Sequence, residues 1–417
     1  NNNYKKIITH NPDGDYQHQH HIAVFKTVIK YASNKSLYIF SNDKSLLPKK
    51  HLEKKIKLIK SFYKDEANTL LSDFYRNFLR KEGIKKYVKN LLAYHTNWTK
   101  PAISPKKEYS NRIFNIMATI LSALEWRKNN GSIKLYTDKI GYNYYKNLNL
   151  LDIWDRGVDI ETLENIPEDI NPKVFFAAGK FYALEKEPLG SISIDRDLIT
   201  WKNIYHKVEN KKLIITHREA VGYHFGYIPK EKLVIPKGYE FEENLDWTIN
   251  PCNMSLFRFN DQEFKDKFIN HLKFYIKGND DIKLQHDIII GNYVAEMLFV
   301  EQRYVSMLAK KMDIDINPVL KNEILENNWD NMIYNPEGLL THIWVFKKNI
   351  DRRPKDKEWL TRRLLMRIYN DYPKYFNILI DKFPELSKYV DKYFISNKDK
   401  IDYKEICYHA GISLDLI

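Results

Sequence analysis

Residues 191–201, Ser-Ile-Ser-Ile-Asp-Arg-Asp-Leu-Ile-Thr-Trp, join an alternating apolar run to two carboxylates two positions apart. The run predicts a short buried strand, with Asp195 and Asp197 at its end. Side chains at positions i and i+2 of an extended segment share a face, so both carboxylates can point to one edge of a sheet. Such a pair can bind a hard divalent cation that also holds a diphosphate. The alternative interpretation is the polar end of an exposed strand, because the Asp-x-Asp pattern is common by chance.

The chain around this stretch alternates helical patterns with short apolar runs. Alternation of this kind predicts an α/β sheet with crossover helices, in which ligands bind at the carboxyl ends of the strands. Asp138 follows a predicted strand, so three carboxylates fall where a ligand is expected. The expected strands are 90–95, 132–137, 189–194, 212–217 and 232–236, and the expected helices are 109–128, 141–148 and 173–186, with mostly helical structure in 283–312 and 358–394.

Composition and charge narrow the classes of protein. The 417 residues predict two or three domains, and the net charge of +13 is compatible with a nucleic-acid binder. The basic residues are mixed evenly with acids, which favours solvated faces over a specific nucleic-acid partner, and a basic cleft would also suit an anionic substrate. No apolar run is long enough to span a bilayer, and the two cysteines have no close partner. We therefore expect a cytoplasmic protein, with the oligomeric state left open.

Six stretches follow one another between about residues 88 and 350: LLAYHTNWTKP, ILSALEWRKNNGSIKLYTDKIG, FFAAGKFYALEKEPLGSISIDRDLITW, TINPCNMSLFRF, FVEQRYVSMLAKK and THIWVFKK. In this order they resemble the GT-A glycosyltransferases, and more closely a bacterial group of GT-A-like proteins that is often found near polysaccharide biosynthesis genes. Two features depart from the pattern, since Arg196 is bulky where a small residue is common and the segment NPCNMSLF lacks the usual glycines.

The resemblance implies a GT-A-like domain over residues 87–417, with a mixed sheet flanked by helices and a helical extension from about residue 355. It implies a metal-dependent transferase that moves a sugar from a UDP- or GDP-linked donor to a glycan acceptor. Asp195, Asp197 and His342 would bind Mn²⁺ or Mg²⁺, and a neutral imidazole suits Mn²⁺.

The resemblance also assigns roles to residues outside this set. Glu301 is, in addition to Asp197, a candidate catalytic or acceptor-binding carboxylate. The alternative is that Glu301 lies on a helix and pairs with Arg303 or another neighbour. For the lysines the alternative is a solvated position, and for the aromatic residues it is the core. The candidates for binding the donor are Tyr94, His95, Trp98, Asp138, Lys180, Asp195 and Lys348.

The N-terminal segment THNPDGDYQHQHH resembles part of the PIG-L-type zinc deacetylases, which act on N-acetylglucosamine groups. The match makes residues 1–86 a partial deacetylase-like segment, with His21 as a zinc ligand and His18 as a catalytic or substrate-binding histidine. The family's other ligands come from an upstream HPDDE segment that this chain lacks, and one ligand cannot build a catalytic Zn²⁺ site. Deacetylation is therefore not expected, and a polar loop that caps a helix is the alternative. A non-catalytic nucleotide- or glycan-binding module, with both parts degenerate, is the competing function.

Overall fold

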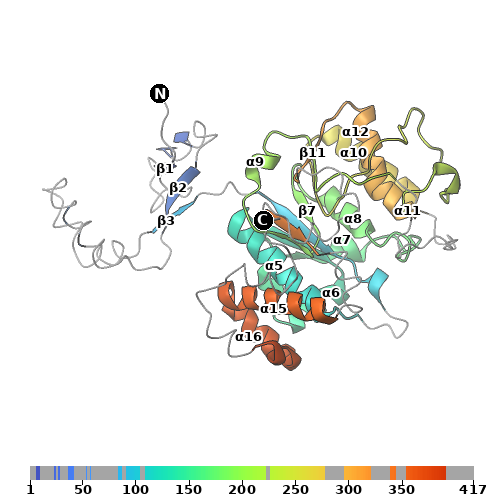
Figure 1. Ribbon diagram of the computed structural model, residues 1–417. Helices are drawn as coiled ribbons and strands as arrows, with labels where there is room; N and C mark the ends of the chain where they lie inside the picture. Colours follow the sequence, from blue (N-terminus) through green and yellow to red (C-terminus); the bar gives the residue numbers. More distant parts are fainter. Residues whose placement is uncertain are drawn as a thin grey trace. The chain divides into compact units, whose positions relative to one another are not determined.

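The computed structural model divides into two compact units, residues 1–89 and 90–417 (Figure 1). In the first unit the structure describes three strands and six isolated helical residues. In the second it describes most of the chain between residues 91 and 390. The described ranges are 6–9, 36–41 and 83–86, with residues 23, 24, 27, 28, 53 and 57, and then 91–103, 109–221, 226–277, 295–320, 339–343 and 354–390.

The first unit contains a three-stranded sheet in the order β1-β2-β3. Strand β1 (Lys6–Thr9) runs parallel to β2 (Ser36–Ser41), which pairs antiparallel with β3 (Gly83–Lys86). His18 and His21 lie outside the described residues, so their zinc-binding role stays a prediction.

The second unit is built on a seven-stranded mixed sheet in the order β11-β9-β10-β7-β4-β5-β6. Every strand runs in the same direction except β10, which is antiparallel to both of its neighbours. This is the α/β sheet with crossovers that the alternating pattern predicts. The strands are β4 (Ala93–Asn97), β5 (Ile133–Thr137), β6 (Val158–Asp159), β7 (Ile192–Ile194), β9 (Leu213–Ile215), β10 (Leu256–Phe259) and β11 (Ile316–Pro318).

Helices cover both faces of this sheet, because alternate strand residues point into two separate cores. Ala93 and Leu135 belong to the core under α5, α6, α15 and α16, whereas Tyr94 and Tyr136 belong to the core under α7, α8, α10 and α12. None of the described helices combines the length and apolar character needed to cross a membrane. The longer helices are α5 (Ile113–Asn129), α6 (Lys139–Asn147), α8 (Ala178–Lys186), α10 (Gln262–Ile276), α12 (Tyr304–Lys311), α15 (Pro354–Asp371) and α16 (Pro373–Lys382).

Short helical segments connect these elements. One of them, η6, is a π-helix inserted between α11 and α12, and π-helical turns are frequent at functional sites. The short segments are η2 (Lys100–Ala102), η3 (Leu151–Ile153), α7 (Glu161–Glu164), α9 (Tyr205–Val208), η5 (Lys230–Lys232), α11 (Ala295–Leu298), η6 (Phe299–Arg303) and η8 (Pro384–Tyr389).

A separate two-stranded sheet joins distant parts of the second unit. Strand β8 (Leu198–Thr200) pairs antiparallel with β12 (Leu340–His342), so that Leu198 lies opposite His342. The Trp201 indole N–H donates to Thr341 Oγ1 at 2.8 Å, across 140 positions of sequence. This pairing brings residues 340–342 next to the segment that follows β7.

Two predicted elements differ from the structure. Residues 232–236 were expected to form a strand, and this is wrong. The Val234 amide donates to Glu296 Oε1 and its carbonyl accepts from the Tyr275 hydroxyl, so side chains satisfy the backbone groups that a neighbouring strand would use. Helix 173–186 begins only at Ala178, because the Asn171 side chain accepts from the amides of the next residues and holds them in a turn.

Candidate functional site

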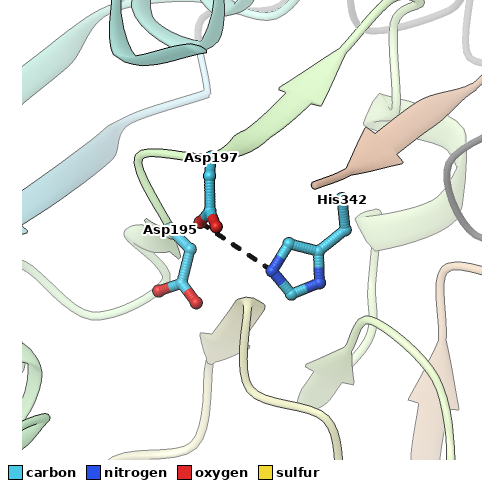
Figure 2. A group of neighbouring side chains, drawn as sticks. All are labelled: Asp195, Asp197 and His342. Atoms are coloured by element: carbon cyan, nitrogen blue, oxygen red, sulfur yellow. Dashed lines mark ion pairs between the residues drawn. The ribbon is translucent and has the colours of Figure 1, made fainter. Parts of the chain in front are cut away.

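Asp195 and Asp197 occupy a tight turn between β7 and β8. The Leu198 amide donates to the Asp195 carbonyl at 2.9 Å, and the Asp195 amide donates to the Ser255 carbonyl at 2.7 Å. The carboxylates are therefore brought together by a turn, not by the extended pleat expected from the sequence. Figure 2 shows both side chains directed toward the same space, with His342 opposite them.

His342 reaches this turn through the β8–β12 pairing. The Ile343 amide donates to the Asp197 carbonyl at 3.1 Å, and His342 Nε2 lies 3.8 Å from Asp197 Oδ1 (Figure 2). Asp197 is 7% exposed and His342 is 4% exposed. The two side chains thus face each other in a largely dehydrated setting, where charge interactions are stronger than in water.

The three side chains could hold a divalent cation. One ligand atom from each of Asp195, Asp197 and His342 lies within 4.8 Å of the other two. Oxygen and nitrogen ligands about 2.1 Å from one ion would lie about 3 to 4.2 Å apart, so a small inward shift would bring all three within reach of one ion and leave its other positions for water or phosphate. Two carboxylates and an imidazole suit Mn²⁺, and the carboxylates also suit Mg²⁺.

Lys180 connects this group to Glu301. Its ammonium lies 2.7 Å from Asp195 Oδ1 and 2.9 Å from Glu301 Oε1, on the side of the cluster formed by α8 and η6. Burial alone would lower the pKa of Lys180, but the carboxylates of Asp195 and Glu301 outweigh it and raise this pKa well above its usual value. The lysine is therefore a permanent cation between two carboxylates.

Asp195 is a weaker acid than an exposed aspartate. Burial, together with the negative charge of Asp197, raises its pKa to about 6, although Lys180 opposes this shift. Two carboxylates at one site disfavour each other's ionisation. A bound cation would relieve this repulsion.

A cavity of about 250 Å³ opens beside the cluster at the carboxyl ends of β4 and β7. The chain moves outward from β4 through β5 and β6 and then returns to place β7 on the other side of β4, so the strand order reverses here and makes a topological switch point. Open α/β sheets bind ligands, nucleotides among them, at such points. The cavity is lined by Thr96, Asn97, Trp98, Asn115, Thr119, Phe176, Ala177, Gly179, Lys180, Asp195, Arg196 and Asp197.

Other predicted site residues lie elsewhere. Tyr94 and His95 are fully buried and do not line the cavity. The Asp138 carboxylate accepts from the Thr99 amide and hydroxyl and from the Gly141 amide, so it caps α6 and holds the loop after β4. Lys348 lies outside the described residues. Of the predicted donor-binding residues, Trp98, Lys180 and Asp195 line the cavity.

His95 is buried in the core and is linked by hydrogen bonds to the turn that carries Asp195 and Asp197. Trp154 Nε1–H donates to its Nδ1 at 3.1 Å, so the proton of the neutral ring lies on Nε2, which is 3.0 Å from Ser122 Oγ. Ser122 in turn donates to the carbonyl of Leu198, directly after Asp197. This chain of hydrogen bonds links the core to the turn that carries both carboxylates.

Acid is expected to destabilise the second unit through His95. Burial lowers the pKa of His95 to about 3, so between pH 6.5 and 3 the unfolded chain takes up a proton that the folded chain does not. Stability from this residue is complete above pH 6.5 and falls by about 1.4 kcal/mol per pH unit below it. All eight tryptophans follow residue 90, so urea unfolding by tryptophan fluorescence reports on this unit. The His95→Gln variant should lose less stability between pH 6 and 4 than the wild type, and equal losses would contradict this assignment.

A second polar group was not predicted from the sequence. His217 Nε2 lies 3.1 Å from Glu219 Oε1, and Asn253 Nδ2 donates to the same oxygen at 2.8 Å. Burial alone would raise the pKa of Glu219, but the hydrogen bonds from His217 and Asn253 lower it. The sequence did contain a signal for this group. The polar residues Thr216 to Glu219 directly follow an apolar strand, just as Asp195 and Asp197 do.

Comparisons with known proteins place most of the chain in one family. No curated protein matches it significantly. A solved structure similar to it is that of the glycosyltransferase GlyE from Streptococcus pneumoniae, with 12% sequence identity and a TM-score of 0.26. That match covers 61% of this chain and 55% of GlyE, so the chain spans little more than half of that enzyme's length. A family model matches residues 88–382, and the chain therefore belongs to DUF6734, a family of unknown function.

Proposed function

We propose that this protein is a metal-dependent glycosyltransferase that moves a sugar from a nucleotide-sugar donor to a glycan acceptor. The observation that carries the proposal is the convergence of Asp195, Asp197 and His342 within 4.8 Å at the switch point of the sheet. A divalent cation held by carboxylates can also bind a diphosphate, and this group of ligands lies where α/β sheets bind nucleotides. The resemblance of the sequence to GT-A enzymes supports the same assignment.

In this proposal Asp195, Asp197 and His342 hold Mn²⁺ or Mg²⁺. When bound, the ion neutralises the diphosphate as it leaves the sugar. Lys180 lines the cavity, and its three N–H groups already face Asp195, Glu301 and, at 3.4 Å, the Met254 carbonyl, so it would donate to a phosphate or sugar oxygen by exchanging this last, long bond. Glu301 is 3% exposed, accepts from Lys180 and is absent from the cavity lining, so we assign it to positioning Lys180.

The test is nucleoside diphosphate release from UDP- and GDP-linked sugars by the full chain with Mn²⁺. We expect slow release without a glycan acceptor, with water taking the acceptor's place, and a loss of at least about 100-fold when EDTA removes the metal. Replacing exposed Glu168 by glutamine should change nothing. Release that is indifferent to EDTA would contradict the assigned metal role.

One observation favours a second candidate, a nucleotide-binding module without transferase activity. Lys180 already supplies a positive charge 2.7 Å from Asp195, which partly occupies one of the three proposed metal ligands. A module of this kind would bind nucleoside diphosphates but release none from any donor sugar. The release assay with donor sugars, run beside a binding measurement with nucleoside diphosphates, therefore separates the two candidates.

A further inference from the structure

The segment that leads into β10 contains a bulge opposite β9. Within β10, Phe257 pairs with Ile215, whereas the isolated bridge before it joins Cys252 to Arg218. The step between these two pairings is five positions on the β10 side and three on the β9 side, so the β10 side carries two extra residues. Bulges of this kind bend a strand and redirect its groups, and they are over-represented next to active sites.

Asn253 closes this bulge with its side chain. Its Oδ1 accepts from the Ser255 amide at 3.2 Å and from the Ser255 hydroxyl at 2.6 Å, so a side chain satisfies a backbone amide within the bulge. Asn253, Met254 and Ser255 are at most 5% exposed, and none of them has a positive φ. The bulge therefore forms without a glycine in the segment NPCNMSLF.

Two other buried residues hold Asn253. Its Nδ2 donates to Glu219 Oε1 at 2.8 Å, and His217 Nε2 lies 3.1 Å from the same oxygen. The Asn253 backbone amide donates to the His217 carbonyl at 2.9 Å. Both the backbone and the side chain of Asn253 are thus fixed to the segment that follows β9.

The bulge directs two backbone carbonyls toward the proposed metal site. The Met254 carbonyl accepts from Lys180 Nζ at 3.4 Å, and the Ser255 carbonyl accepts from the Asp195 amide at 2.7 Å. Lys180 Nζ itself lies 2.7 Å from Asp195 Oδ1. Two neighbouring residues therefore contact both members of the ion pair whose carboxylate a metal ion would use.

We infer that Asn253 is a positioning residue, which holds the bulge that sets Asp195 and Lys180 for binding the metal ion. This inference rests on the proposed function, because it requires an ion held by the two aspartates and His342. Asn253 does not line the cavity, so it acts through the two carbonyls of the bulge. Outer groups that orient the ligands of a metal ion change its affinity by about 10- to 100-fold.

The test is calorimetric titration of the full chain with Mn²⁺ alone. Asn253→Ala should weaken Mn²⁺ binding at least about tenfold, because the amide and hydroxyl of Ser255 lose their acceptor and the bulge can relax. Asn253→Asp combined with Glu219→Gln exchanges the donor and acceptor of their hydrogen bond at constant net charge, and it should bind Mn²⁺ within about threefold of the wild type. Asn317, whose side chain donates to the Leu213 carbonyl at the other end of β9, supplies the control, and Asn317→Ala should bind Mn²⁺ as the wild type does.

Thermal unfolding of the same variants without metal separates positioning from stability. A merely structural Asn253 would lower the unfolding temperature in Asn253→Ala and leave the Mn²⁺ affinity unchanged, and this result overturns the inference. Equal weakening in Asn253→Ala and in the exchanged pair overturns it as well, because the restored hydrogen bond would then restore no affinity.

Asn253→Ser keeps the test decisive if Asn253→Ala does not fold. A serine hydroxyl can still accept from the Ser255 amide, but more weakly, and it cannot donate to Glu219 as the amide does. This variant should bind Mn²⁺ at least about threefold more weakly than the wild type, and unchanged affinity overturns the inference. Failure of the wild type to bind Mn²⁺ contradicts the proposed function itself, and the inference falls with it.

Discussion

Replacing Asp197 by asparagine is expected to lower nucleoside diphosphate release at least about 100-fold and to weaken Mn²⁺ binding by at least tenfold. Asparagine preserves the shape of the side chain and removes the charge. The Asp197 backbone would still bond to Ile343, so the turn should stay in place. Mn²⁺ titration and release of UDP or GDP from the donor sugar measure the two effects.

The Asp197→Asn variant should also remain folded. Its thermal unfolding without metal should occur at the same temperature as that of the wild type or higher, because the change removes repulsion with Asp195. Asp313→Asn is a matched control, since Asp313 is exposed and its φ of 53° is one that asparagine adopts readily. Full activity and unchanged Mn²⁺ affinity in Asp197→Asn would remove Asp197 from the metal site.

Replacing Lys180 by methionine is expected to destabilise the second unit by about 3 kcal/mol and to lower its unfolding temperature by about 4 to 6 °C. Methionine keeps the apolar stem but leaves Asp195 and Glu301 without their shared cation. Removing one partner of a buried ion pair costs far more than the pair itself contributes. Thermal unfolding followed by tryptophan fluorescence measures the effect.

Lys273→Met is the comparison that isolates burial. Lys273 lies 2.7 Å from Glu185, the same distance as Lys180 from Asp195, but its side chain is 33% exposed, against 13% for Lys180. An exposed pair contributes less than about 1 kcal/mol. The double variant Lys180→Met with Glu301→Gln should recover part of the loss, because it removes one unpaired carboxylate. Equal destabilisation by Lys180→Met and Lys273→Met would mean that solvent screens the Lys180 cluster as well.

Four strands of the central sheet, β4, β5, β7 and β9, could be predicted because each carries an apolar signal, whereas β6 (Val158–Asp159) and β11 (Ile316–Pro318) are too short and too polar to give one. Ile133–Thr137 and Ile192–Ile194 lie inside the expected ranges, and the carboxylates follow the strand ends as the sheet rule requires. The segment 232–236 has the same apolar composition but bonds to side chains of other elements, which local sequence cannot reveal. Local pattern therefore identified four of the seven strands of this sheet and could not show which apolar runs find a strand partner.

The site could be predicted only where residues are close in sequence or where a resemblance linked them. Asp195 and Asp197 were visible as a pair, and His342 was identified through the THIWVFKK segment. The contact between Lys180 and Glu301 spans 121 positions, and the bond from Arg196 to Tyr145 spans 51. No periodicity or spacing encodes such contacts, because they depend on how α6, α8 and η6 are placed around the sheet.

The β8–β12 pairing has a consequence for the order in which the protein is assembled. A ribosome completes β4, β5 and β7, together with both aspartates, long before it reaches His342, and closing so long a stretch of chain costs entropy before any contact repays it. Both aspartates are thus synthesised well before the imidazole. A nascent chain would present its three proposed metal ligands together only after every strand of the central sheet, β11 included, has been made.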